Sequence, residues 1–361
     1  MIPPDVLPPP PPPAVLACGA ATRFSMVTAP KRIAATATAA GYNLITSDDA
    51  DVRGYAYAFE GDTLVAQRGD VPLFSGTPAE FTTIADGDRT LLGIANGTPA
   101  PASTTLVALD ARLAPLGPPV PHDTWVGGIG SLARNDAGSL AFLATLVPAF
   151  TSETDVRIVG ADGAPVGPNH VVIMDGESPT ISSAGDNFLV VWNAYGTSSR
   201  NIHASVVAMT SDSFVSTIAP TTVSVLTADA FNARGAYAAA SETYLIAWMQ
   251  KPGDPLDHIF VSLRDRDLKE IGTPKEIGTG NQPYVIAGKD DFLVVWRIDA
   301  VRLGAARVKP DGTVTPVPIE GTARDAISMD LVVRAGQPAL VWVERDDGGG
   351  ATVRFDPLCS R

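Results

Sequence analysis

The chain has 361 residues, of which 45% are hydrophobic and only 18% charged, and 39 Asp and Glu residues outnumber 26 Lys and Arg residues. The net charge of −13 and the lack of a basic cluster with interleaved aromatic residues argue against a phosphate-binding surface, so nucleic acid is not an expected partner. No apolar run approaches the roughly 18 residues of a membrane-spanning helix.

The first 17 residues, MIPPDVLPPPPPPAVLA, are rich in proline. The proline run at 8–13 predicts an extended, semi-rigid spacer, although such a run can also bind an SH3-like groove. We therefore expect residues 1–17 to be a disordered tether and 18–361 to be a single domain. The segment lacks the charged start and apolar stretch of a signal peptide, so either the protein is cytoplasmic or the sequence begins after processing. We favour the second alternative and expect an extracytoplasmic location.

From residue 31 onward the chain divides into seven similar units, each with short strand-like segments. The units span about 31–74, 80–119 and 127–173, then begin near 178, 232, 282 and 325, and the last stops after its third segment. A small-residue turn between the first and second segments recurs at Gly41, Gly87, Gly138, Gly185, Gly288 and Gly336, with Ser241 in the fifth unit. A second turn recurs between the third and fourth segments, as Gly61-Asp62, Asp162-Gly163, Ser211-Asp212 and Asp311-Gly312.

A unit of four strands repeated at this period is typical of a β-propeller blade. No segment has the 3.6-residue periodicity of a helical solenoid, and a β-sandwich would not explain seven copies of one unit. The sequence therefore predicts an all-β, seven-bladed β-propeller with four-stranded antiparallel blades; a merged pair among the divergent first three units would give six. Residues 22–27 (TRFSMV) precede the first unit, and we expect them to close the ring by completing the last blade.

The two cysteines, Cys18 and Cys359, lie at the two ends of the predicted domain. In a reducing compartment they would be unrelated thiols, whereas in an oxidising one they would form a disulfide that joins the chain ends. A metal site is the weaker interpretation, because neither cysteine has a second Cys or a His at ligand spacing. We expect the disulfide, and two free thiols in denatured, unreduced protein would contradict it.

The segments AGDNFLVVW (184–192), ASETYLIAW (240–248) and AGKDDFLVVW (287–296) carry a resemblance to a known group. They are similar to the repeats of bacterial exported β-propeller proteins, which are often lipoproteins with a proline-rich tether after the lipidated cysteine. The resemblance implies a propeller fold and an envelope location, but no general activity. The kelch double glycine, the WD40 Gly-His and Trp-Asp pairs, and the sialidase Asp-box are all missing from the sequence.

Loops that follow the second strand of each blade should share one rim with the loops between blades, and this rim is the expected ligand site. Polar residues of these loops are the candidate ligand-binding residues: Asp48, Asp49, Asp51, Tyr195, Arg200, His258, Arg297, Asp299, Arg302, Arg345 and Asp346. The alternative is that these loops are polar only because water surrounds them.

Other candidates are weaker. Asp48, Asp49 and Asp51 could offer oxygen ligands to calcium, but the loop lacks the Gly and the closing Glu of an EF-hand. The repeated tryptophans at 192, 248, 296 and 342 could form a stacking surface, but we expect them in the core between blades. The histidines have no zinc-site spacing, and no GxSxG nucleophile motif occurs, so we assign no catalytic residue.

Three functions are compatible with the sequence. The first is a non-catalytic cell-surface or secreted module, expected to be a monomer, that binds a protein or glycan at the rim and needs no cofactor other than calcium. The second is a polysaccharide hydrolase or lyase with rim carboxylates as acid and base, and the third is a structural envelope protein. An enzyme should have a deep channel with a carboxylate of raised pKa among arginines, whereas a binder should expose aromatic or apolar surface.

Overall fold

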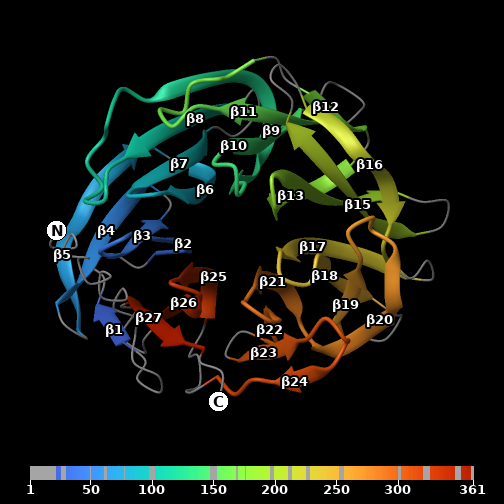
Figure 1. Ribbon diagram of the computed structural model, residues 1–361. Coiled ribbons are helices and arrows are strands. Elements are labelled where there is room, and N and C mark those ends of the chain that lie inside the picture. Colours follow the sequence, from blue (N-terminus) through green and yellow to red (C-terminus); the bar gives the residue numbers. More distant parts are fainter. Residues whose placement is uncertain are drawn as a thin grey trace, which may run out of the picture.

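A computed structural model shows a ring of β-sheet blades around a central axis (Figure 1). The structure describes residues 22–25, 30–48, 50–60, 63–76, 78–96, 102–146, 153–167, 170–174, 176–195, 199–209, 214–224, 228–251, 256–299, 302–319, 326–345 and 351–358. The predicted tether at 1–17 and both cysteines, Cys18 and Cys359, lie outside these ranges. Within them the structure contains no helical segment with the length and hydrophobicity needed to span a bilayer.

Seven blades, each built from four antiparallel strands, form the ring, which confirms the predicted architecture. The inner strands are β2 (Arg32–Ala37), β6 (Pro78–Asp86), β9 (Val120–Arg134), β13 (Gly176–Ala184), β17 (Asp229–Ala238), β21 (Asn281–Ala287) and β25 (Ala326–Arg334). The second strands are β3 (Gly41–Ser47), β7 (Arg89–Asn96), β10 (Leu140–Leu146), β14 (Asn187–Tyr195), β18 (Thr243–Lys251), β22 (Phe292–Arg297) and β26 (Gln337–Arg345).

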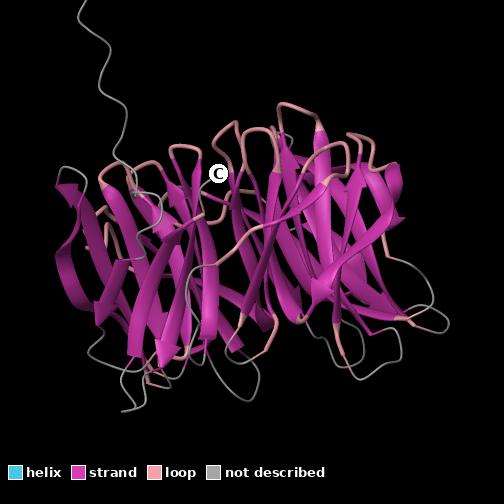
Figure 2. Cartoon of the chain, turned by 90° about the horizontal axis from the view of Figure 1, so that it is seen from below, coloured by secondary structure: helices cyan, strands magenta, loops and turns pink. Residues whose placement is uncertain are grey.

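The third strands are β4 (Asp51–Glu60), β8 (Ala102–Leu109), β11 (Glu153–Val159), β15 (Arg200–Met209), β19 (His258–Arg264), β23 (Leu303–Val308) and β27 (Ala351–Pro357). The separate outer strands are β5 (Thr63–Ser75), β12 (His170–Met174), β16 (Phe214–Thr222), β20 (Glu270–Thr279), β24 (Val314–Pro316) and β1 (Thr22–Ser25). All of these strands run between the two faces of the ring (Figure 2).

Ring closure occurs in the last blade, where the N-terminal strand β1 pairs antiparallel with β27. Thr22 lies opposite Phe355 and Ser25 opposite Thr352, so β1 completes the order β1-β27-β26-β25. The seventh blade therefore takes one strand from one end of the chain and three from the other, as the sequence predicts. Closing the ring in this way removes the open edge that an incomplete blade would expose.

Blades 2 and 3 are joined differently from the sequence expectation. The last part of the predicted unit two, up to residue 119, contains no strand after β8 and is a turn with a single bridge between Leu109 and Pro115. The outer strand of blade 2 is the first part of β9, which pairs with β8 and continues as the inner strand of blade 3. The two blades therefore form one continuous seven-stranded sheet.

The hydrophobic core consists of seven clusters in the described part of the chain, one at each junction between neighbouring blades. Successive residues of a strand point to opposite faces, so Leu293 and Val295 pack against blade 7 while Val294 and Trp296 pack against blade 5. Because both faces of each blade are covered, the second strands read as continuous apolar runs.

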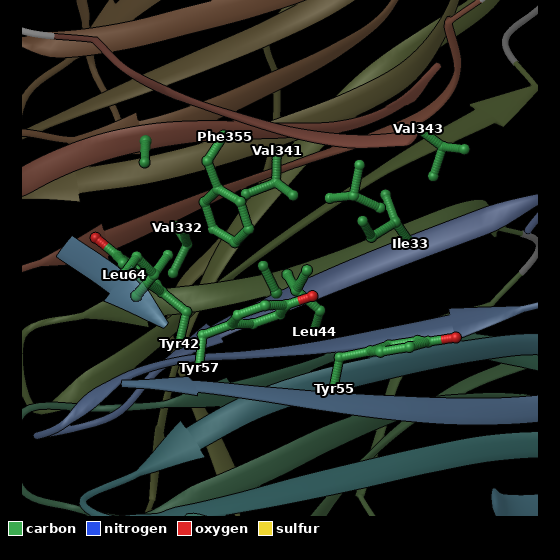
Figure 3. Packing of buried hydrophobic residues seen from close by; sticks show 13 residues of the cluster. Ile33, Tyr42, Leu44, Tyr55, Tyr57, Leu64, Val332, Val341, Val343 and Phe355 are labelled. Carbon is green, nitrogen blue, oxygen red and sulfur yellow. The ribbon is translucent and has the colours of Figure 1, made fainter. Parts of the chain in front are cut away.

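The four repeated tryptophans belong to this core, as expected. Trp192, Trp248, Trp296 and Trp342 are between 0% and 6% exposed, and each faces the preceding blade. At the junction of blades 1 and 7, Phe355 packs on Tyr42 with Ile33, Leu44 and Val341 nearby (Figure 3). This aromatic cluster holds the closing blade to the first one.

The predicted turns at 61–62 and 211–212 lie outside the described residues. Most of the predicted turn glycines that the structure describes have the left-handed backbone, but Gly41 and Gly288 do not. Gly163 and Gly312 have φ of 83° and 82° in the turn between third and fourth strands. Leu113 and Leu268 take the same place in blades 2 and 5, which sequence reasoning missed. Gly41 has no positive φ; instead, a Cβ there would lie 2.2 Å from the carbonyl oxygen of Tyr57, so close strand approach requires this glycine.

Candidate functional site

The predicted rim residues lie at one end of the blades, at or beside the ends of second strands and the starts of third strands. Arg200 and His258 begin β15 and β19, and Arg297 ends β22. Tyr195 and Arg345 end β14 and β26, whereas Asp49 and Asp346 lie outside the described residues. Arg297, Asp299 and Arg302 meet in one loop of blade 6, and the other described candidates are distributed over blades 1, 4, 5 and 7.

In blade 1 the rim carboxylates form contacts within their own blade. Asp48 Oδ1 accepts hydrogen bonds from the backbone N–H groups of Ala50 and Asp51, at 2.8 and 2.9 Å. Asp51 Oδ2 accepts from Arg53 at 3.0 Å, and its Oδ1 accepts from Ser75 at 2.9 Å. In the part of the chain that the structure describes, no group of three or more acidic, His or Cys side chains is arranged to hold a metal ion. The calcium site remains a sequence prediction.

Rim residues of the other blades also pair locally. Arg200 Nε lies 3.3 Å from Glu177 Oε2. Arg302 Nε donates to Asp299 Oδ2 at 2.6 Å, and His258 Nδ1 lies 2.8 Å from Glu276 Oε1. Each of these three pairs joins residues of one blade. Arg200 also reaches blade 5, because its backbone N–H donates to Asp229 Oδ1 at 2.8 Å and its guanidinium lies 5.0 Å from the Phe231 ring centroid. Binding through the rim stays a prediction.

A cavity of about 330 Å³ occupies the centre of the ring. The inner strands of all seven blades, β2, β6, β9, β13, β17, β21 and β25, contribute residues to its wall. Hydroxyl side chains of Thr82, Thr83, Ser131, Thr180 and Ser182 line the side formed by blades 2 to 4. This volume lies at the lower end of the range for small-molecule sites, roughly 300–1,000 Å³.

Four neighbouring blades place different polar side chains at one level of this channel. In each, the residue that pairs with the position just before the repeated tryptophan lines the cavity: Thr180 pairs with Val191, Arg234 with Ala247, Tyr284 with Val295 and Asp330 with Val341. Blades 5, 6 and 7 thus present Arg234, Tyr284 and Asp330 in succession around the channel, and Thr180 occupies the same level in blade 4, just before them.

A β-bulge lies just before this level in three blades. Ser178, Asn232 and Gln282 have φ of 48°, 52° and 51°, and the strand register shifts at each of them. Such bulges bend a strand and redirect the side chains that follow. The bulges therefore coincide with the place where polar side chains reach the channel instead of packing between blades.

Side chains from adjacent blades satisfy several hydrogen-bonding groups of the inner strands. Ser131 Oγ accepts from the N–H of Ile181 at 2.7 Å, and Thr180 Oγ1 donates to the carbonyl of Ala233 at 3.1 Å. Asp330 Oδ2 accepts from the N–H of Ala35 at 2.9 Å, and its Oδ1 accepts from its neighbour's N–H at 2.8 Å. These contacts connect one blade to the next and fix the wall of the channel.

Asp330 and Tyr284 lie deep in the protein but retain some exposed surface because they border the cavity. Burial raises the pKa of Asp330 to about 6, although two backbone N–H groups and the charge of Arg234 oppose this. Burial likewise raises the pKa of Tyr284. The centre of the Arg234 guanidinium lies 5.8 Å from the Tyr284 ring centroid, within cation–π distance.

Sequence reasoning missed these three residues. Arg234, Tyr284 and Asp330 lie in segments that read as ordinary first strands, NARGAY, QPYVIA and SMDLV. All three residues pair with the position just before a repeated tryptophan. Aligning the first and second strands of each unit would have revealed this common position, but the alignment depends on where the bulges lie.

No protein-family model matches the chain, and no match was found among curated proteins. Solved structures do match. Hydrazine synthase of Kuenenia stuttgartiensis aligns with a TM-score of 0.58 and 12% identity over 92% of this chain and 97% of that chain. The WD40 domain of Toxoplasma gondii coronin gives 0.55 and 10% identity over 97% and 89%.

Trypanosoma rangeli sialidase, solved as a covalent intermediate with 2,3-difluorosialic acid, aligns with a TM-score of 0.52 and 10% identity over 95% of this chain and 59% of that chain. At such identities the three similarities concern the fold alone. The chain thus has a propeller fold like those of the WD40 and sialidase structures, although it lacks the sequence motifs of both groups.

Proposed function

We propose that this propeller is a non-catalytic recognition module that binds a glycan, or the end of one, in its central channel. The observation that carries the proposal is the cavity of about 330 Å³, where polar side chains from neighbouring inner strands meet at one level. The rim is a weaker candidate, because the charged groups of Arg200, His258 and Arg302 are already paired with carboxylates of their own blades. The rim would then frame the entrance.

A sugar matches the chemistry of this wall. Hydroxyl groups of Thr82 and Thr83 on one side, and Tyr284 on the other, can exchange hydrogen bonds with sugar hydroxyls. The ring of Tyr284 offers an aromatic surface, and Ile33, Phe81 and other apolar residues complete the wall. A cavity of this size accommodates a small molecule or a chain end, but not a folded protein surface.

Binding fits the site better than hydrolysis. Glycoside hydrolases typically use two carboxyl groups that flank the bond to be broken, and Asp330 is the only carboxylate in the described cavity wall. Its raised pKa meets one expectation for an enzyme. However, both of its oxygens already accept backbone hydrogen bonds, which gives it a structural role between blades 7 and 1.

The test is ligand-observed NMR with a panel of D-glucose, D-galactose, D-mannose and their uronic acids, with purified wild-type protein and two variants. Thr82→Phe should fill the channel from blade 2 and abolish every binding signal. Thr315→Phe, an equal change on the exposed outer strand β24, should leave binding unchanged. The proposal fails if no panel member binds, or if Thr82→Phe, shown to be folded by circular dichroism, binds as well as wild type.

A further inference from the structure

Among the described residues, Arg234 has no carboxylate ion pair, and unlike Arg264 and Arg334, which bond to two protein oxygens each, it makes one long hydrogen bond. Seven arginines of the described chain form carboxylate ion pairs: Arg53, Arg134, Arg157, Arg200, Arg302, Arg307 and Arg354. For Arg234, the described residues supply only one hydrogen bond, from Nη1 to the carbonyl of Ala233 at 3.4 Å. A guanidinium with free donors thus lines the central cavity.

The described surroundings of Arg234 leave its guanidinium without a direct ion pair, although its charge acts on the carboxyl groups of Asp330 and Glu80. The Tyr284 ring lies beside the guanidinium, and Asp330, two blades away, has both oxygens engaged by backbone N–H groups. A guanidinium has five N–H donors in a planar fork that matches a carboxylate, and such charge-assisted pairs are stronger than neutral hydrogen bonds. A carboxylate that entered the cavity would use the donors that the protein leaves free.

We infer that the channel selects a sugar with a single negative charge, a uronic-acid type of glycan, whose carboxylate binds Arg234. This inference rests on the proposed function and adds the chemical class of the ligand. A doubly charged group such as a sugar phosphate fits less well, because the carboxylate of Asp330 in the cavity wall would repel the second charge. The charged and titratable groups around the site are Arg234, Arg32, Asp330, Glu80 and Tyr284.

The site should bind an acidic sugar more tightly as the pH falls toward 5.5. Protonation of Asp330, whose pKa burial raises to about 6, removes a negative charge that faces the bound carboxylate. Burial also raises the pKa of Glu80, which lies outside the cavity wall, and the charges of Arg32 and Arg234 oppose this shift. A sugar carboxylate, with a pKa of about 3–4, stays ionised throughout this range. A neutral sugar should show no comparable change.

Isothermal titration calorimetry at low ionic strength and pH 5.5 tests the inference with matched ligands and variants. The ligands are D-glucuronate, D-glucose, D-glucosamine and D-glucose 6-phosphate, with the galactose and mannose counterparts of the first two. Arg234→Met removes the charge but keeps the side-chain length, and Arg266→Met makes the same change at an exposed turn between β19 and β20. Circular dichroism and urea midpoints confirm that each variant is folded.

We expect a uronate to bind at least about tenfold more tightly than its neutral sugar, since hydrogen bonds between charged groups are stronger than those between neutral groups. Arg234→Met should remove this difference and Arg266→Met should keep it. Between pH 7.5 and 5.5, the affinity of the wild type for the uronate should rise. If Arg234→Met does not fold, the inference is tested by the affinities of the wild type for the uronate, the neutral sugar, glucosamine and glucose 6-phosphate.

The two proposals fail in different ways. Equal affinity for uronate and neutral sugar, with both lost in Thr82→Phe, would overturn the acidic-ligand inference and leave glycan binding in place. Tighter binding of glucosamine or of glucose 6-phosphate than of glucuronate would also overturn it. If no sugar of any charge binds, both the inference and the proposed function are wrong.

Discussion

Truncation of Phe355 tests whether the junction of blades 1 and 7 closes the ring through a shared core. Its side chain is fully buried, and its ring centroid lies 5.3 Å from that of Tyr42 and 6.4 Å from that of Tyr57, both in blade 1 (Figure 3). Phe355→Ala removes the whole ring, and substitutions of this kind in a core cost about 3–5 kcal/mol. Urea unfolding followed by tryptophan fluorescence measures the change in the free energy of unfolding.

The contact across the junction can be isolated with a double-mutant cycle. Tyr42→Ala and Phe355→Ala are measured singly and together, and the interaction energy should be about 0.5–1.5 kcal/mol, which is typical of aromatic pairs. Additive effects would show that the rings do not interact. A loss below about 1 kcal/mol for Phe355→Ala alone would refute the shared core, because a fully buried phenylalanine cannot be removed so cheaply from a packed interior.

Two further predictions concern buried histidine and close glycine contacts. His122 lies 2.8 Å from the Gly163 carbonyl, and burial lowers its pKa; the unfolded chain therefore takes up a proton first, and stability should fall as pH drops below about 6.5. His122→Gln should weaken this decline between pH 7.5 and 5.5 in urea unfolding, and an unchanged decline would contradict the reasoning. At Gly304, a Cβ would lie 2.4 Å from Trp296 Cε2, so Gly304→Ala should lower the unfolding free energy by about 1–3 kcal/mol. Gly117→Ala, where nothing lies within 4 Å, should stay within about 0.5 kcal/mol, and similar losses in both variants would refute the steric explanation.

The sequence alone determined the architecture of this protein. Apolar runs such as FLVVW, repeated at the spacing of one blade and separated by local turn residues, predicted the blades, the burial of Trp192 and its equivalents, and the strand exchange that closes the ring. The blades and the buried tryptophans could be predicted because they depend on local preferences, and the strand exchange because the last unit stops after its third strand. The side-chain alternation of a strand, the turn chemistry and the need to bury a large aromatic side chain all act over a few residues.

The tertiary structure decided the location of the candidate site. The sequence predicted the site at the rim, because the rim loops are polar. In the described residues, however, Asp51, Arg200 and Arg302 form ion pairs within their own blades, whereas Arg234 and Asp330 line the channel. Their position depends on the register between strands and on bulges that shift it by one residue, and one residue is enough to turn a side chain to the opposite face. Register is fixed by packing between blades that are distant in sequence, so only the assembled ring brings an arginine, a tyrosine and an aspartate to one level of its channel.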